Sequence, residues 1–405
     1  MRFRTPSAIL LLSASHVSMA QPQPENVSFE AWDNAGQATQ EPQQWSSLKT
    51  SDGGAFINSL VPQLCWRSND AHTGQYSVNL RTIGSVVGPA NGLLTNGRVH
   101  AELDVANSYM YTVQDQEQWR TTMTSRPDSL IGWYKAAPGS GDRPNVGALL
   151  HIDEGRLPAF GTESNYVAGA SWKGPYSPVT QWTRFSTPFV YLNDWQPEWL
   201  LFILTAGDSA GSVEGTQAWY DDLALIYNVQ CQPDAQSVAP GESLNIGYST
   251  GGIPLAPVTF TAELSDASGS FTSPVVIGSV VSTDADGTIA CVVPLGIDAG
   301  SGYRVRVSGS SPFYAPLQCT LEVTTATGVA QPISGAGYIE VIGDRIWVDL
   351  RQSGQYSCFN SQGALLATGV VGAGREPIPT PVCRGMMLVQ VSTEGRSFVQ
   401  RIVMP

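Results

Sequence analysis

The chain has 405 residues and a formal net charge of −13, with lysine only at Lys49, Lys135 and Lys173. A chain without a basic patch lacks the electrostatic footprint of a nucleic-acid-binding or anionic-membrane-binding protein, so neither partner is expected. After the N-terminal region, no stretch approaches the ~20 apolar residues of a membrane-spanning helix, and no membrane span is expected.

Residues 1–20 have the features of an export signal. Arg2 and Arg4 precede a short apolar stretch, Ala8 to Ala14, and the small residues around Ala20 suit cleavage before Gln21. The six cysteines fit an oxidising compartment. The sequence therefore predicts a secreted or outer cell-surface protein.

Residues 21–228 contain ten of the 11 tryptophans. Short alternating runs between turn signals are typical of strands, and seven or more of them predict a two-sheet jelly roll. The expected strands are Tyr76–Ile83, Arg98–Asp104, Leu130–Ala136, Val146–Asp153, Arg184–Leu192, Trp199–Ala206 and Gln217–Tyr227.

Two further β domains are expected after residue 228. Six short strands in 229–325 predict an immunoglobulin-like sandwich, and turn signals in 326–405 predict a small C-terminal β-sandwich. The fold class is therefore all-β, with three sandwiches in series. The expected strands of the middle domain are Ser243–Ser249, Thr259–Leu264, Val275–Val281, Thr288–Val293, Tyr303–Ser308 and Gln318–Val323.

The cysteine spacing leaves the disulfide pattern open. No C-x-x-C pair occurs, so a structural zinc site is not supported. Cys358 and Cys383 share the last domain and are a candidate pair. Two of Cys231, Cys291 and Cys319 can pair in the middle domain, which leaves Cys65 free or bonded across domains.

Short motifs in the first domain carry a family resemblance. Asn26–Glu30 with Trp32, Ala71–Val78, Leu130–Lys135 and Trp219–Tyr227 are similar to the carbohydrate-metabolism domain family of secreted Bacteroidota proteins. The resemblance covers about residues 26–228. It implies a jelly roll related to carbohydrate-binding modules, with a polysaccharide or glycan as its partner.

The other two domains also carry resemblances. Phe260–Phe271 and Gly302–Val307 resemble an immunoglobulin-like module of the same secreted proteins. Gly354–Tyr356, Gly385–Val391 and Arg401–Val403 resemble a type IX secretion sorting domain, which implies the type IX secretion machinery as a partner. The terminal lysines usual in that domain are absent, and the Cys358/Cys383 pair is atypical of it.

The first resemblance also implies a cofactor. In jelly-roll carbohydrate-binding modules, a Phe-Glu near the first strand and an Asp-Asp near the last strand supply ligands to a structural calcium. Glu30 and Asp222 match those positions. Calcium takes 6–8 oxygen ligands, so backbone carbonyls would complete the site. The alternative is a pair of ordinary surface acids.

Alternation places several polar and aromatic side chains on outward strand faces. These are His100, Glu102 and Asp104 on one strand, Trp133 and Lys135 on a second, and His151 and Asp153 on a third. If the three faces coincide, they form a concave surface suited to sugar hydroxyls. The alternative is a plain solvated sheet face, because alternation is the default in antiparallel sheets.

Aromatic residues in polar or Gly/Pro-rich surroundings are further candidates. Trp119, Trp172 and Tyr176 are expected in loops, where they would serve as platforms for a sugar ring. Trp182, Trp199 and Trp219 lie in expected strands and are assigned to the core. Loss of glycan binding without loss of folding is therefore expected for Trp172→Ala.

Catalysis lacks a motif. Glycoside hydrolysis needs two carboxylates flanking one bond, and Glu102 or Asp104 with Asp153 are the available pairs. No G-x-S-x-G elbow is present. The leading hypothesis is a non-catalytic glycan-binding or adhesion protein. The alternatives are a glycan-degrading enzyme or its accessory subunit, and a structural surface protein without glycan binding.

Overall fold

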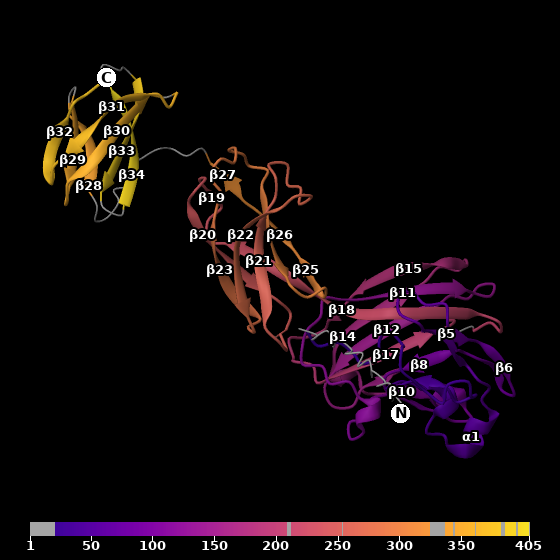
Figure 1. Ribbon diagram of the computed structural model, residues 1–405. Helices are drawn as coiled ribbons and strands as arrows, with labels where there is room; N and C mark the ends of the chain where they lie inside the picture. Colours follow the sequence, from indigo (N-terminus) through magenta and orange to yellow (C-terminus); the bar gives the residue numbers. More distant parts are fainter. Residues whose placement is uncertain are drawn as a thin grey trace, which may run out of the picture. The chain divides into compact units, whose positions relative to one another are not determined.

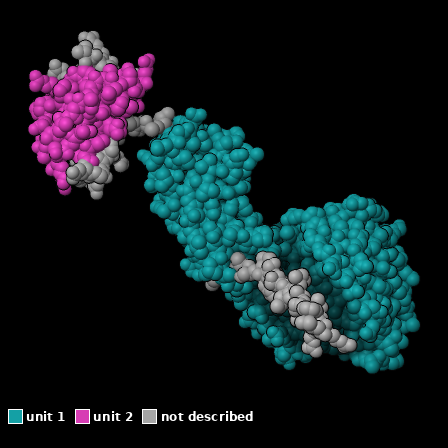
Figure 2. All heavy atoms as spheres, in the orientation of Figure 1, with its two compact units in different colours: residues 1–324 teal, residues 325–405 magenta. Residues whose placement is uncertain are grey.

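The computed structural model describes residues 21–208, 212–252, 254–324, 337–342, 345–360, 362–381, 385–393 and 396–404. The chain divides into two compact units, unit 1 (residues 1–324) and unit 2 (residues 325–405), which Figure 2 distinguishes by colour. The expected export signal, residues 1–20, lies outside the described residues. Strands dominate both units, and the all-β prediction is confirmed.

Unit 1 begins with a jelly roll in which short strands alternate with turns. Its helical elements are α1 (Gly54–Leu60) and the 3-10 turns η1 (Leu48–Thr50), η2 (Val105–Asn107), η3 (Glu117–Trp119) and η4 (Glu163–Asn165). Its strands are β1 (Trp32–Asp33), β2 (Glu41–Pro42), β3 (Ser46–Ser47), β4 (Cys65–Ser68), β5 (Ser77–Arg81), β6 (Ile83–Ser85), β7 (Gly88–Ala90), β8 (Leu93–Thr95), β9 (Arg98–His100), β10 (Tyr109–Tyr111), β11 (Ser129–Ala137), β12 (Asn145–His151), β13 (Arg156–Leu157), β14 (Tyr166–Lys173), β15 (Val179–Pro188), β16 (Val190–Tyr191), β17 (Trp199–Thr205) and β18 (Gln217–Pro233).

Two sheets form the layers of this jelly roll. One has the order β15-β11-β18-β5-β4, and the other has the order β16-β14-β12-β17-β8-β3. Figure 1 shows β15, β11, β18 and β5 above β12, β17 and β8. Three short strands, β13-β10-β9, make a separate small sheet.

Strict alternation in β11 explains why its sheet has two different faces. Leu130, Tyr134 and Ala136 are buried between the sheets, whereas Trp133 and Lys135 on the other side are half-exposed. The core between the layers is filled by large side chains such as Trp45, Phe202 and Tyr220. Burial of so much apolar surface is the main stabilising term for the sandwich.

The last strand of the jelly roll continues into the next sandwich. β18 spans Gln217–Pro233, and its first half pairs with β11 and β5. Its second half pairs antiparallel with β20 and parallel with β25. The expected boundary at residue 228 therefore falls inside one continuous strand.

The rest of unit 1 is an immunoglobulin-like sandwich. One sheet continues from β18 through β20 and β23, and the other has the order β22-β21-β24-β26. Its strands are β19 (Ser237–Val238), β20 (Ser243–Ser249), β21 (Val258–Leu264), β22 (Val275–Ser282), β23 (Asp286–Val292), β24 (Arg304–Gly309), β25 (Tyr314–Pro316), β26 (Gln318–Thr320) and β27 (Glu322–Val323).

Unit 2 is a small sandwich of two sheets, β28-β29-β32 and β31-β30-β33-β34. Its own core includes Ile346, Cys358 and Val389. Its strands are β28 (Gly337–Ile342), β29 (Arg345–Leu350), β30 (Gly354–Asn360), β31 (Leu365–Val371), β32 (Gly374–Ile378), β33 (Gly385–Thr393) and β34 (Arg396–Met404).

One expected strand is shorter than predicted. Only Arg98–His100 of Arg98–Asp104 is a strand, because the following residues bond to other segments. The Ala101 N–H donates to Asp52, and the Glu102 N–H donates to the Ser108 hydroxyl. Asp104 caps η2 by accepting from the Ala106 N–H. Capping side chains such as aspartate favour turns over strands.

The structure settles part of the cysteine pairing. Cys231 of β18 and Cys319 of β26 form a disulfide, which is one of the pairings left open for the middle domain. Cys65 and Cys291 are buried free thiols. Cys358 is also a buried free thiol, so the candidate pairing with Cys383 is not formed; Cys383 itself lies outside the described residues.

Candidate functional site

Four tryptophans lie together on the outward face of the sheet β15-β11-β18-β5-β4. They are Trp182 of β15, Trp133 of β11, Trp219 of β18 and Trp66 of β4, and each is half-exposed. We call this set the tryptophan face. The strand register forms it: Lys135 pairs with Trp219, and both Trp219 and Trp66 pair with Asn79.

The spacing of these rings follows from the sheet. Neighbouring strands lie about 4.8 Å apart, so residues two strands apart in one row are separated by about 10 Å. Trp219 has β11 between it and Trp182, and β5 between it and Trp66. The face is therefore a row of indoles across the strands, at intervals comparable to two sugar residues of an extended polysaccharide.

Cationic and acidic neighbours fix the rings of the tryptophan face. The Lys135 ammonium lies 5.4 Å from the Trp182 ring centroid and 2.7 Å from Asp70, and Asp70 accepts a hydrogen bond from the Trp182 indole N–H. The Arg81 guanidinium lies 4.4 Å above the Trp66 ring. Cation–π contacts of this kind hold an indole in one orientation.

The ring of Trp133 is stacked on an imidazole. His72 lies parallel to Trp133, with centroids 3.8 Å apart, and meets Trp182 edge-on at 6.3 Å. The His72 Nδ1 is 2.6 Å from Asp222. His72 therefore links the tryptophan face to the acidic residues of β18.

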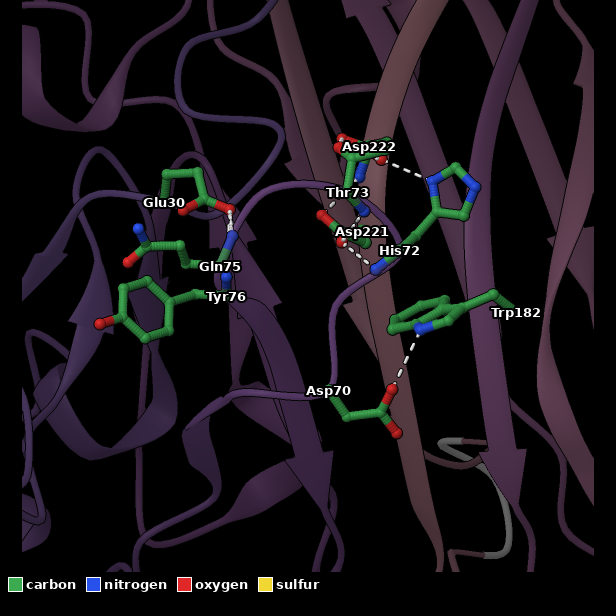
Figure 3. A network of polar contacts seen from close by, with 9 residues as sticks. All are labelled: Glu30, Asp70, His72, Thr73, Gln75, Tyr76, Trp182, Asp221 and Asp222. Carbon is green, nitrogen blue, oxygen red and sulfur yellow. Dashed lines mark hydrogen bonds and ion pairs between the residues drawn. The ribbon is translucent and has the colours of Figure 1, made fainter.

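The loop that carries Asp70 and His72 is held by acids on both sides (Figure 3). Glu30 accepts from the N–H groups of Gln75 and Tyr76. Asp221 accepts from the His72 N–H at 2.7 Å, and Asp222 accepts from the Thr73 hydroxyl. A side chain on Gly74 would collide with Glu30, which explains a glycine at the tip of the loop.

Electrostatics distinguish the two adjacent aspartates. Burial raises the pKa of Asp221 to about 7, with a further contribution from the charge of Asp222. Hydrogen bonds from the His72 and Thr73 backbone oppose this shift. Asp221 is fully buried and Asp222 is half-exposed. Both carboxylates nevertheless reach the same loop, because the β11–β18 register shifts at this point and Asp222 has a φ of 46°.

The structure brings two of the sequence-predicted binding residues together, Trp133 and Lys135. The expected concave surface shared with His100 and His151 is wrong, because β9, β11 and β12 belong to three different sheets. The alternation in each strand was sound, but sequence does not show which sheet a strand joins.

His100 and Glu102 belong to a second polar cluster. His100 contacts Asp52 at 3.0 Å and Glu102 at 3.3 Å, and it stacks on Tyr109 with centroids 4.6 Å apart. The hydrogen bond to Asp52 raises the pKa of His100. The Tyr111 hydroxyl also donates to Asp52.

His151 does not lie on a solvated face. Its side chain is fully buried and contacts the Thr112 hydroxyl at 2.9 Å, and burial lowers its pKa. Asp153 is exposed beyond the end of β12, with a φ of 44°. The reasoning that joined Asp153 to Glu102 or Asp104 across strand faces fails, because neither Asp104 nor Asp153 is in a strand.

The three expected loop aromatics have different settings. Trp119 lies in η3 beneath the Arg98 guanidinium at 3.8 Å, and Tyr176 is 57% exposed beside Arg143. Trp172 is in β14 and not in a loop, so its expected place in a loop is wrong. It is half-buried and packs against Tyr134 and Phe185 at the margin of the core.

Sequence reasoning missed Trp66, Trp182, Trp219, Asp70 and His72. For the three tryptophans, the signal was present in the odd–even pattern of each strand. Trp219 alternates with the buried Ala218 and Tyr220. For Asp70 and His72 there was no signal, because their loop reaches the sheet through residues far away in the chain, such as Lys135, Asp221 and Asp222.

Comparisons with known proteins give low similarity. No family model and no curated protein matches the chain. A biofilm-associated protein structure (BSP domain) is 12% identical with a TM-score of 0.18, covering 94% of this chain and 67% of that one. The adhesin domain of Epf from Streptococcus pyogenes is 10% identical with a TM-score of 0.26, covering 65% and 80%.

A β-glucuronidase from Ruminococcus gnavus is 8% identical with a TM-score of 0.16, covering 60% of this chain and 38% of that one. Likeness at these levels carries no information about what this chain binds. Among the described residues, no helix is long and apolar enough to cross a membrane.

Proposed function

We propose that unit 1 is a non-catalytic adhesion module, secreted or held at the cell surface, that binds an extended polysaccharide along the tryptophan face. The observation that carries this proposal is the row of half-exposed indoles across one sheet. The C–H face of a sugar packs on an aromatic plane, and the nearby polar groups suit its hydroxyls.

Pre-organisation supports the same function. Lys135, Asp70, His72 and Arg81 fix the rings through contacts that exist without ligand. A ligand therefore loses little affinity to the ordering of side chains. Asp70 is 54% exposed and Lys135 is 16% exposed, so the acid is the more accessible hydrogen-bonding group.

The test is affinity electrophoresis of the full mature chain in gels containing soluble β-glucan, xylan or mannan. We expect retardation by at least one polymer, and loss of that retardation in Trp182→Ala. Trp195→Ala is the matched control, because Trp195 is 50% exposed in a loop outside the tryptophan face. Equal retardation of both variants would contradict the proposal, and release of reducing ends would contradict its non-catalytic part.

We also propose that calcium, when bound, is held by Glu30 and Asp222 with backbone carbonyls. Carboxylate oxygens suit calcium, and both acids contact the loop of residues 72–76. The described residues hold no group of three or more metal-binding side chains, so carbonyls must supply most ligands. A rise in melting temperature with calcium, reversed by chelator and absent in Glu30→Gln, would support this. Equal melting with and without calcium would contradict it.

For export, we propose that unit 2 is the sorting domain of a type IX-like route. Its separate core is consistent with an independent address domain. Deletion of residues 325–405 should leave the protein inside the cell envelope, detected by fractionation. Unchanged export of the truncated chain would reject this assignment.

A further inference from the structure

The six-stranded sheet of the jelly roll carries a groove on its outward face. The groove has a volume of about 1040 Å³. Its floor includes Gly147 and Leu149 of β12, Gly169 of β14 and Ile203 of β17. We call it the aliphatic groove. It lies on the other sheet of the sandwich from the tryptophan face.

Within the described residues, the rims of this groove carry large apolar side chains that are mostly exposed. Six of them are between 58% and 75% exposed: Val86, Val87, Leu103, Val105, Val190 and Leu192. Scattered exposed apolar side chains are ordinary, but six around one groove mark a binding surface. Deep clefts lined mostly by apolar groups are the usual sites for small ligands.

The lining chemistry argues against a sugar. Among the described residues that line the groove, Tyr166 is the only aromatic. A pyranose would therefore find no row of planes on which to stack, and its hydroxyls would lie on an apolar floor that includes Gly147, Leu149 and Ile203. Unpaired hydroxyls in an apolar site carry a desolvation penalty.

The lining also argues against an extended peptide. Every peptide unit brings an N–H and a C=O group that need partners when buried. The floor strands β12, β17 and β8 are each paired on both sides, and β14 is paired with β12 along its length and with β16 at Ala168 and Gly169, so most of the floor's backbone groups are already used. A chain without polar groups along its length fits this floor better.

One end of the groove differs from the rest. Asn145, Lys173 and Thr205 form a cross-strand row and all line the groove. The Lys173 ammonium is 49% exposed, and its partner Asp208, 3.8 Å away, is also 3.8 Å from the Arg143 guanidinium. The floor therefore runs from this polar, cationic row to the apolar row around Leu149, about 13 Å along β12.

We propose that the aliphatic groove binds a single fatty acyl chain, with the methylene chain over Gly147 and Gly169 and a carboxylate head at Lys173. The two glycines leave the floor open: a Cβ on Gly147 would meet no atom within 4 Å, and one on Gly169 would meet only the Ala148 carbonyl at 3.9 Å. This ligand class differs from the glycan proposed for the tryptophan face.

The probe is a series of saturated fatty acids, octanoate to dodecanoate, measured by isothermal titration calorimetry below their micelle concentrations. With the full mature chain, we expect one site and an affinity that rises about fourfold per added methylene. Gly147→Leu fills the floor in ordinary strand geometry and should weaken dodecanoate at least tenfold. Lys173→Gln should weaken dodecanoate but leave dodecanol binding unchanged.

Two controls keep the outcome decisive. Val87→Ser removes an exposed rim valine, and Val276→Ser removes one that is 60% exposed on β22 of the immunoglobulin-like sandwich. Only the first should weaken dodecanoate. Circular dichroism and melting of each variant report folding. No saturable binding, or equal binding by Gly147→Leu, would overturn the proposal. So would light scattering showing a dimer that Val87→Ser dissociates, because a second copy would then cover the groove.

Discussion

The two outward faces of the jelly roll are made from similar strands but present different chemistry. The sheet β15-β11-β18-β5-β4 carries half-exposed indoles with fixed cationic and acidic partners. The opposite sheet carries glycines and bare aliphatic side chains around a groove. The comparison teaches that in an antiparallel sandwich each outward face is free to specialise, because only the inward residues are constrained by the core.

The largest expected effect separates a core tryptophan from those of the tryptophan face. Trp172→Ala removes contacts with Tyr134 and Phe185 and should lower the free energy of unfolding by about 3–5 kcal/mol. Denaturant titration measures this loss. Polysaccharide binding by the remaining folded protein should be unchanged, and a selective loss of binding with normal stability would break the distinction.

Removal of two indoles from the tryptophan face should instead weaken polysaccharide binding. The double variant Trp66→Ala/Trp219→Ala takes away two rings of one cross-strand row. We expect the polysaccharide affinity to fall by about a hundredfold, or roughly 3 kcal/mol, in quantitative affinity electrophoresis. The dodecanoate affinity of the groove should stay as in the parent chain, and a parallel loss there would show that the two faces are not independent.

A smaller effect tests pre-organisation alone. Arg81→Ala leaves all four indoles but frees the Trp66 ring from its guanidinium neighbour. An exposed cation–π contact contributes about 0.5–1 kcal/mol, so we expect polysaccharide binding to weaken by a few-fold. Arg304→Ala, on β24 of the immunoglobulin-like sandwich, is the control. An unchanged affinity in Arg81→Ala would show that the ring needs no fixing.

A further expected effect is a pH dependence of stability near the groove side of the sandwich. Burial raises the pKa of Glu41 from about 4.5 to about 7, and its carboxylate accepts from Ser47 of β3, an edge strand of the groove sheet. A raised pKa in the folded state means that stability is highest below about pH 4.5 and falls as pH rises to about 7. Glu41→Gln should remove this slope in melting curves. A slope of unchanged size would assign it to other groups.

Much of the fold was predictable, because the alternation of apolar and polar residues that is typical of strands is visible in the sequence. Ser243–Ser249 matches β20 in both bounds, β11 is longer than its expected range by one residue at each end, and β17 ends one residue before its expected end. The failure at Arg98–Asp104 has a local cause. Side-chain capping by Asp104 competes with strand pairing, and alternation alone does not register that competition.

The binding faces were only partly predictable. Alternation correctly places Trp133 and Lys135 on one side of β11, but it does not reveal which strands are neighbours. Trp182 of β15 and Trp66 of β4 come together only through sheet order, which depends on contacts far apart in the chain. The aliphatic groove gave no sequence signal, because glycine and valine at outward positions also occur on plain surfaces.

The continuous strand β18 has a mechanical consequence. Its first half is held by β11 and β5 and its second half by β20 and β25, while Cys231 ties it covalently to β26. A pull on the immunoglobulin-like sandwich therefore reaches the tryptophan face along one stretched backbone, with no hinge loop between them. Hydrogen bonds on both sides of the strand are loaded in shear and must yield together, so tension is carried directly to the tryptophan face.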